Sequence, residues 1–162
     1  FNTRYICTTF DWFGGGIDVT PSKKDNKEKE VFHKTLRDMC NRHDKNYYKK
    51  YKKWCDEYFY LPHRKEPRGI GGIFFDYKKD DFEKNFKFVR DVGVTFESIF
   101  KKIISKKIKK KWTSQDKENQ YIKRGRYAEF NLLYDRGTKF GLQTDGNVEG
   151  ILMSLPPYAK WK

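Results

Sequence analysis

The sequence contains few cysteines and no long apolar segment. Its three cysteines, Cys7, Cys40 and Cys55, are an odd number without Cys-x-x-Cys spacing, which argues against a disulfide framework and a zinc site. No apolar run approaches the roughly 20 residues of a membrane-spanning helix. Phe1 is not followed by the basic and apolar segments of a signal peptide. We therefore expect a protein of a reducing compartment, the cytoplasm, with no transmembrane segment.

Acidic residues are too few to balance the basic ones. There are 36 lysines and arginines against 22 aspartates and glutamates, so the formal net charge of the 162 residues is +14. Such a charge attracts anions, whether nucleic acid, acidic lipid or a polycarboxylate. The length suits one domain that can bury a core, and we expect residues 1–162 to form a single domain.

Apolar residues recur at three- and four-residue steps in two long segments, which predicts helices. The first segment runs from 30 to 58 and is ended by Pro62, and the second runs from 80 to about 112. Residues 2–10 and 69–76 are rich in β-branched or aromatic side chains and are predicted to be strands.

The C-terminal part of the chain also has an alternating pattern. Residues 126–134 and 138–144 are predicted to be antiparallel strands joined by a turn at 135–137, and residues 149–155 a third strand. Strands joined by hairpins and interspersed with long helices predict an α+β fold, an antiparallel β-sheet flanked by α-helices.

Two glycine-rich motifs place glycines, aromatic residues and charges side by side. Residues 12–21 contain three consecutive glycines and Asp18, and residues 63–76 contain Arg64, Arg68 and three further glycines. Glycine is needed where the backbone bends or approaches another group closely. One such motif alone would equally suit a simple bend. Two motifs in one short chain favour a site walled partly by main chain.

These motifs, together with residues 124–142 and 151–157, resemble the oxygen-dependent coproporphyrinogen III oxidases. The similarity includes residues 47–59 and is weakest in the lysine-rich segments 22–30 and 101–121. It implies a broad antiparallel sheet covered by helices, and a homodimer to which the chain from Tyr127 onward contributes. Because the family's chains extend beyond both ends of this sequence, we interpret residues 1–162 as one domain truncated at both ends.

The resemblance implies an oxidoreductase of haem biosynthesis. The reaction is oxidative decarboxylation of two propionates of coproporphyrinogen III, which gives protoporphyrinogen IX. O2 is the oxidant and no cofactor is expected; the sequence has neither a Gly-x-Gly-x-x-Gly fingerprint nor a P-loop. The family's proposed catalytic histidine falls immediately before the residue that matches Phe1. The alternative is therefore a catalytically incomplete fragment acting as a dimerisation or basic nucleic-acid-binding module, and a presequence upstream would make the location mitochondrial.

The substrate has pyrrole N–H donors at its centre and carboxylates at its rim, so its site needs an acceptor and cations. The resemblance implies that Asp18 accepts the pyrrole N–H groups and that Arg4 and Arg68 hold propionates, which makes these three the predicted catalytic residues. From the residues alone, Asp18 could instead cap a helix or form a turn, and Arg4 could be a solvated strand residue. Arg68 could equally form an ion pair with Glu66 or Asp76.

The resemblance adds further substrate-binding residues on either side of these motifs: Asn2, Thr3, Asp145, Gly146 and Asn147. The chain departs from the family in the second group. The family usually has arginine where this chain has Asn147 and serine where it has Gly150. The missing cation makes a propionate contact at this position weaker or absent.

His33 and His63 match residues described as ligands of a divalent metal in some bacterial members of the family. Two histidines lack the third protein ligand that a catalytic metal normally has. We therefore interpret both as histidines satisfied within the fold, and expect no metal.

The lysines between 101 and 111 could form a nucleic-acid surface. No recognised RNA- or DNA-binding motif accompanies them, and their alternation with isoleucines is typical of a solvated helix face. We expect no nucleic-acid partner.

Overall fold

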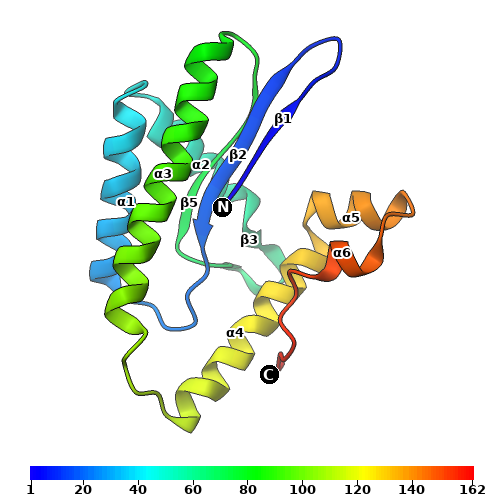
Figure 1. Cartoon of the computed structure of the whole chain (residues 1–162). Coiled ribbons are helices and arrows are strands. Elements are labelled where there is room, and N and C mark those ends of the chain that lie inside the picture. Colours follow the sequence, from blue (N-terminus) through cyan, green and yellow to red (C-terminus); the bar gives the residue numbers. More distant parts are fainter.

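The computed structural model describes residues 1–162 and contains one three-stranded antiparallel sheet (Figure 1). Its strands are β1 (Asn2–Ile6), β2 (Trp12–Val19) and β5 (Gly71–Lys78), in the order β1-β2-β5. A small second sheet pairs β3 (Tyr60–Leu61) with β4 (Glu66–Pro67) around the 3-10 turn Pro62–Arg64.

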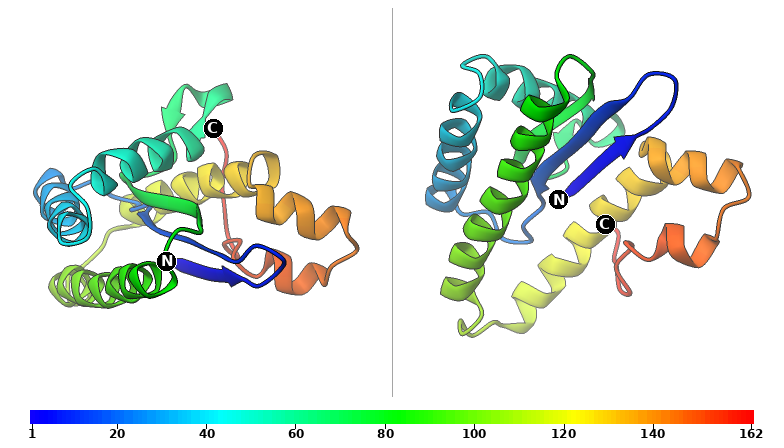
Figure 2. Two further views of the ribbon diagram at one scale, coloured as in Figure 1. Left: turned by 90° about the horizontal axis from the view of Figure 1, so that it is seen from above. Right: turned by 45° about the horizontal axis from the view of Figure 1, so that its top comes forward.

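Six helices accompany the sheet: α1 (Asn26–Asn41), α2 (Tyr47–Tyr58), α3 (Phe82–Lys107), α4 (Ser114–Leu133), α5 (Arg136–Gln143) and α6 (Val148–Leu152). The prediction of an α+β fold with an antiparallel sheet flanked by helices is confirmed. The views agree that α1 and α3 lie on the opposite side of the molecule from α5 and α6 (Figure 2).

Alternate strand residues point to opposite faces of the sheet. Ile17, Ile73 and Phe75 belong to the buried core, which α1, α2 and α3 complete with Phe32, Leu36, Met39, Cys40, Tyr47, Tyr48, Tyr51, Phe88, Val92 and Ile99. Burying one large apolar side chain contributes roughly 1.5–3 kcal/mol. This layer of helices therefore holds one face of the sheet in place, and leaves residues of the other parity for a site.

A β-bulge interrupts the pairing of β2 with β5 between Phe13 and Gly15. On β5 it falls at Asp76 and Tyr77, and Tyr77 has φ +54°. Bulges of this kind redirect side chains. Here Lys78 is buried and donates to Tyr47 Oη at 2.8 Å, while Asp76 points across β2 toward β1.

The predicted strands at 126–134, 138–144 and 149–155 are wrong, because most of these residues lie in α4, α5 and α6, and residues 153–155 form a turn after α6. Capping side chains begin all three helices: Thr113 with Asp116 in a capping box, then Asp135 and Asn147. Tyr127, Phe130 and Tyr134 follow the three- and four-residue spacing of a helix face, so the apparent alternation came from a short window.

The other predicted boundaries change less. The predicted first strand ends at Ile6 instead of 10, and the first helical segment is divided into α1 and α2 by a turn at 42–46. The second helical segment ends at Lys107, before the lysine-rich turn.

Candidate active site

Arg68 and Asp18 form an ion pair between the two glycine-rich motifs. A terminal nitrogen of Arg68 donates to Asp18 Oδ2, and only 6% of the Arg68 side chain and 21% of the Asp18 side chain are exposed. Asp18 is therefore a strand residue of β2 and not a helix cap. Arg68 pairs with neither Glu66 nor Asp76, because the fold brings the first motif closer to its guanidinium.

Aromatic rings surround the Arg68 guanidinium. Its Cζ lies 4.0 Å from the ring centre of Phe59, 4.7 Å from that of Phe130 and 4.9 Å from that of Tyr127. A cation within about 6 Å of a ring face is attracted by the ring quadrupole, most strongly where water is excluded. The rings therefore orient the guanidinium, while its Nε atom is buried without a hydrogen-bond partner.

A second guanidinium, that of the half-buried Arg124, lies beside this pair on α4. Arg124 donates to the backbone oxygen of Thr20 at 2.7 Å and has no carboxylate partner, and its Nε is also unpaired. Burial lowers the pKa of Arg124, and repulsion by Arg68 adds to this effect. With two guanidiniums and one carboxylate, this end of β2 carries an excess of positive charge.

Arg4 and Asp76 form the second ion pair of the site. The terminal nitrogen of Arg4 lies 2.5 Å from Asp76 Oδ2, and the side chains come from β1 and β5, the two outer strands. Gly14 of β2 lies between them. A Cβ at this position would overlap Asp76 Oδ1 and lie 2.9 Å from Arg4 Nε, so only glycine lets the pair close.

Both ion pairs lie on one face of the sheet. Arg4 is opposite Gly14 in the β1-β2 register, and Asp18 follows Gly14 by four residues, which preserves the face. Four residues of strand separate these positions by roughly 13 Å. Arg4 is thus not simply a solvated strand residue, and 36% of its side chain remains accessible.

The other predicted substrate-binding residues fall into two places. Asn2 shares the face of Arg4, since it lies opposite Gly16, whereas Thr3 has the other parity. Asp145, Gly146 and Asn147 form the turn between α5 and α6, where their hydrogen bonds are local. Gly146 N donates to Gly141 O at 2.9 Å, and Asn147 Oδ1 accepts from Gly150 N at 3.1 Å as the cap of α6. No hydrogen bond or ion pair joins this turn to Arg4, Asp18 or Arg68.

His33 uses both ring nitrogens within the fold. Its Nε2 lies 2.8 Å from Ile70 O and its Nδ1 lies 3.1 Å from Tyr48 Oη, and burial lowers the pKa of the ring. His63 contacts Tyr134 Oη and Glu129 Oε2, both at 2.8 Å. Both ring nitrogens of each histidine are therefore within hydrogen-bond distance of other groups of the fold. No group of three or more histidine, cysteine, aspartate or glutamate side chains is placed to hold a metal ion.

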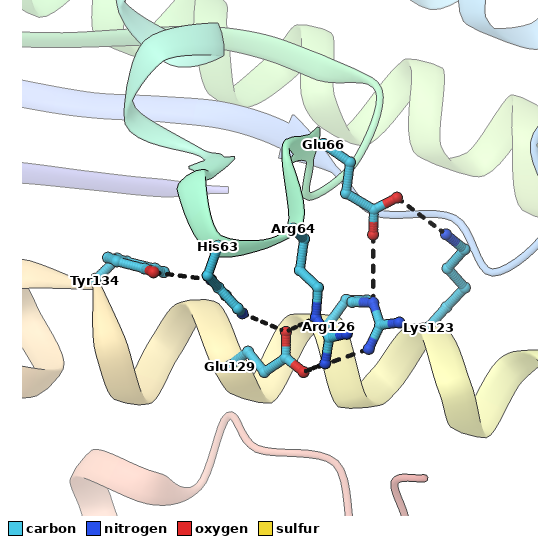
Figure 3. Close-up of polar contacts among 7 residues, drawn as sticks. All are labelled: His63, Arg64, Glu66, Lys123, Arg126, Glu129 and Tyr134. Atoms are coloured by element: carbon cyan, nitrogen blue, oxygen red, sulfur yellow. Dashed lines mark hydrogen bonds and ion pairs between the residues drawn. The ribbon is translucent and has the colours of Figure 1, made fainter. Parts of the chain in front are cut away.

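Glu129 is the centre of a polar network that fixes α4 against the turn after α2 (Figure 3). It accepts hydrogen bonds from Arg64 at 2.5 and 3.0 Å, from His63 at 2.8 Å and from Arg126 at 3.3 Å. These donors, Arg64 first, lower the pKa of Glu129 to about 2. Because Phe130 is the next residue on α4, the network also holds the aromatic wall of Arg68.

Sequence reasoning missed Arg124, Tyr127 and Glu129 as contributors to the site. All three lie in the motif 124–142, which was interpreted there as strand and turn. Arg124 and Tyr127 are three residues apart on α4 and so lie on one side of the helix, which the strand assignment could not show. Phe59 was also missed, and its position at the end of an aromatic helix was the available signal.

The fold and the site define an α+β protein with aspartates and arginines gathered on one glycine-lined face of an antiparallel sheet. The family model described as coproporphyrinogen III oxidase matches residues 1–162, and the chain belongs to this family.

Curated relatives agree with this assignment. The chain is 58% identical over 162 residues to a protein of Rickettsia akari and to one of Rickettsia rickettsii (strain Sheila Smith), and 57% identical to one of Rickettsia conorii. Each is named oxygen-dependent coproporphyrinogen-III oxidase. Each alignment covers 99% of this chain but 58% of the relative, so the chain spans somewhat more than half of their length. No helix of the structure combines the length and the apolarity needed to cross a bilayer.

Proposed function

We propose that this chain provides the substrate-binding face of an oxygen-dependent coproporphyrinogen III oxidase of haem biosynthesis. In the proposed reaction each of two propionates loses CO2 and two electrons and becomes a vinyl group. One O2 for each propionate takes up these two electrons with two protons to give hydrogen peroxide. The names of the relatives support this activity. Family membership also favours an enzyme over a dimerisation or nucleic-acid-binding module.

The observation that carries the proposal is the position of Asp18 and Arg68 on the same sheet face as Arg4. The substrate presents four pyrrole N–H donors at its centre. A carboxylate can accept about four hydrogen bonds, and the hydrogen bond from Arg68 uses one acceptor position of Asp18, on Oδ2. The remaining sites can accept pyrrole N–H groups in charge-assisted hydrogen bonds, which are roughly twice as strong as neutral ones.

Cations on both sides of Asp18 suit the carboxylates at the rim of the macrocycle. Arg4 is partly accessible, and its ion pair with Asp76 engages one nitrogen of a group with five N–H donors. Arg68 and Arg124 supply the excess positive charge at the other end. A fixed guanidinium fork matches a carboxylate in two-point contacts. We propose that these arginines hold propionates and that Asp18 orients the pyrrole that reacts.

The proposed oxidant is O2, without flavin, haem or metal. Because His33 and His63 use their ring nitrogens for Ile70, Tyr48, Tyr134 and Glu129, neither offers a free ligand atom. The role of these residues in the proposed enzyme is structural. Asp18 stabilises developing positive charge on the pyrrole centre from a preorganised position, which is the kind of electrostatic contribution that costs no rearrangement during reaction.

We also propose a homodimer and a cytoplasmic location. Leu132 and Leu133 on α4 are each 48% exposed, and Met153 beyond α6 is 83% exposed, which leaves an apolar surface for a second copy. Cys7, Cys40 and Cys55 are all free thiols, which suits a reducing compartment.

Turnover tests the proposed activity. Coproporphyrinogen III is mixed with the chain under nitrogen, air is admitted, and the porphyrins are separated by chromatography after oxidation. Formation of the dicarboxylate protoporphyrin, with loss of this product in Asp18→Asn, is expected. A chain that is folded by circular dichroism, yet yields only the tetracarboxylate in every sample, would contradict the proposal that it carries the oxidase activity.

A further inference from the structure

The C-terminal end of α3 exposes a row of apolar side chains. Phe100, Ile104 and Ile108 follow one another at four-residue steps, and Trp112 continues the row in the turn before α4. Residues at this spacing lie on the same side of a helix. Ile108 is 74% exposed and Trp112 is 70% exposed. We call these four residues the α3 stripe.

Residues 101–111, which include part of the α3 stripe, are rich in lysine and contain no acidic residue. Seven of these eleven residues are lysines. Lys101 pairs with Glu97 at 2.5 Å and Lys107 pairs with Glu28 at 2.6 Å. The remaining five form no ion pair: Lys102, Lys106, Lys109, Lys110 and Lys111. Lysines in a last helical turn stabilise the helix dipole, but this does not explain the exposed Ile108 and Trp112 on either side of 109–111.

A cleft of about 660 Å³ opens beside the stripe and collects lysines from two other segments. Lys23 and Lys24 come from the loop before α1, and Lys117 comes from the first turn of α4. The cleft has two carboxylates, those of Asp25 and Asp116. Asp25 caps α1 by accepting from Glu28 N at 3.1 Å. Asp116 belongs to the capping box of α4, accepts from Thr113 N at 3.0 Å and pairs with Lys23 at 3.3 Å. The cleft therefore keeps a large excess of positive charge.

An apolar cavity of about 180 Å³ adjoins this cleft and shares Lys23, Asp25 and Lys107 with it. Phe100 and Ile104 of the α3 stripe form part of its wall. A cationic cleft and an apolar recess thus lie next to each other at one end of the molecule. This combination suits a ligand that is anionic on one side and apolar on the other.

We propose that this end of the chain binds the surface of an anionic phospholipid membrane. Ile108 and Trp112 enter the boundary between headgroups and acyl chains, and the unpaired lysines contact phosphate groups. Such a surface combines an apolar face with clustered lysines and lies on the membrane without spanning it. The turn between α3 and α4 is at an extremity of the molecule, away from the β1-β2 hairpin and from α5 and α6, so a flat bilayer can reach it (Figure 1).

The residue types favour lipid over nucleic acid. Residues 101–111 contain no arginine, although arginine provides the planar fork that recognises phosphates and bases in pairs of contacts. Phe100 and Trp112 offer aromatic faces to a base, but Ile104 and Ile108 between them offer no stacking surface. In contrast, hydrocarbon at the membrane boundary removes Ile104, Ile108 and Trp112 from water.

Vesicle co-sedimentation tests the proposal. The chain is mixed with vesicles of phosphatidylcholine alone or with about one third phosphatidylglycerol, and binding only to the latter is expected. Each lysine near an anionic surface changes binding by about fivefold, so the triple variant Lys109→Gln/Lys110→Gln/Lys111→Gln should bind on the order of a hundredfold more weakly. The control Lys45→Gln/Lys49→Gln/Lys50→Gln removes the same charge from exposed residues elsewhere and should bind nearly as the unmodified chain.

Insertion of the stripe is tested separately. Ile108→Ser should weaken binding by about tenfold or more, whereas Val94→Ser, at an exposed position of the same helix, should not. Lipids brominated in their acyl chains should quench the tryptophan fluorescence of the chain, and Trp112→Phe should bind as well but lose most of this quenching. Equal binding to neutral and anionic vesicles would overturn the proposal. So would equal effects of the stripe variants and their controls, or preferential binding to single-stranded RNA that Ile108→Ser does not change.

Discussion

Replacing Glu129 by glutamine should destabilise the chain in a pH-dependent manner. The side chain is 9% exposed and accepts four hydrogen bonds from Arg64, His63 and Arg126. These interactions lower its pKa from 4.5 to about 2. One pKa unit corresponds to about 1.4 kcal/mol, which gives roughly 3 kcal/mol for the ionised carboxylate. Because 34% of His63 and 30% of Arg64 are exposed, solvent screening reduces the expected contribution to about 2 kcal/mol.

The sign of the pH dependence follows from the direction of the shift. A depressed carboxylate pKa stabilises the folded state above the unfolded value, and this stability is lost as the pH falls from about 4.5 toward 2. Urea unfolding should therefore show Glu129→Gln less stable than the unmodified chain by about 2 kcal/mol at pH 7. The gap should narrow by roughly 1 kcal/mol at pH 3.5, because at this pH the unfolded state of the unmodified chain binds a proton at Glu129 and that of Glu129→Gln does not.

Glu118→Gln is the matched control on the same helix. Glu118 pairs with Lys160 at 2.6 Å, and 33% of its side chain is exposed. Partly exposed pairs contribute about 1 kcal/mol or less. A gap for Glu129→Gln that stays constant between pH 7 and pH 3.5, or one no larger than that of Glu118→Gln, would refute the reasoning.

Three further predictions concern the site glycine, the buried guanidinium and the thiols. Gly14→Ala should separate Arg4 from Asp76 and lower the free energy of unfolding by about 1–3 kcal/mol. The control Gly150→Ala in α6, where an added Cβ has no neighbour closer than 3.8 Å, should be neutral or stabilising. Equal urea midpoints for the two variants would contradict this prediction. Arg68→Lys should weaken anaerobic coproporphyrinogen III binding by about tenfold or more in equilibrium dialysis. The reason is that an ammonium cannot stack as a planar group among Phe59, Tyr127 and Phe130. Unchanged binding would show that Arg68 is not part of the binding site. A thiol reagent at pH 8 should label only Cys7 in the folded chain. Burial raises the pKa of the Cys40 thiol to about 12 and also raises that of Cys55, so neither forms the reactive thiolate. Rapid labelling of two or more thiols would contradict this prediction and show that the core opens.

The sequence predicted those parts of the fold whose signals are local. Strands β1 and β5 and helices α1 to α3 have compositions or periodicities that a short window contains, whereas the glycine-rich motif at 12–21 was not predicted to be strand β2. The segment from Arg126 failed because aromatic residues at helical spacing also alternate over a few positions, and its capping box at Thr113 and Asp116 was overlooked. In this segment the turns and helix caps determined the secondary structure more than the residue composition did.

The candidate site was predictable as a set of residues but not as a set of partners. Asp18 and Arg68 are 50 positions apart, and Arg4 and Asp76 are 72 positions apart. No sequence pattern determines such distant pairings without the sheet register that brings them together. The close approach at Gly14 was indicated by the motif, whereas the two side chains that need the space became evident only from the strand order β1-β2-β5.

Binding of coproporphyrinogen III under nitrogen to the unmodified chain and to Asp18→Asn tests the central claim most directly. Equilibrium dialysis, with the bound ligand oxidised and measured as porphyrin, gives the dissociation constants. Asp38→Asn serves as the control, because Asp38 is an exposed acid on α1 that pairs with Lys34. We predict at least about tenfold weaker binding for Asp18→Asn, from the loss of charge-assisted hydrogen bonds, and unchanged binding for Asp38→Asn. Equal affinity in all three folded chains would contradict the assignment of this sheet face as the substrate site.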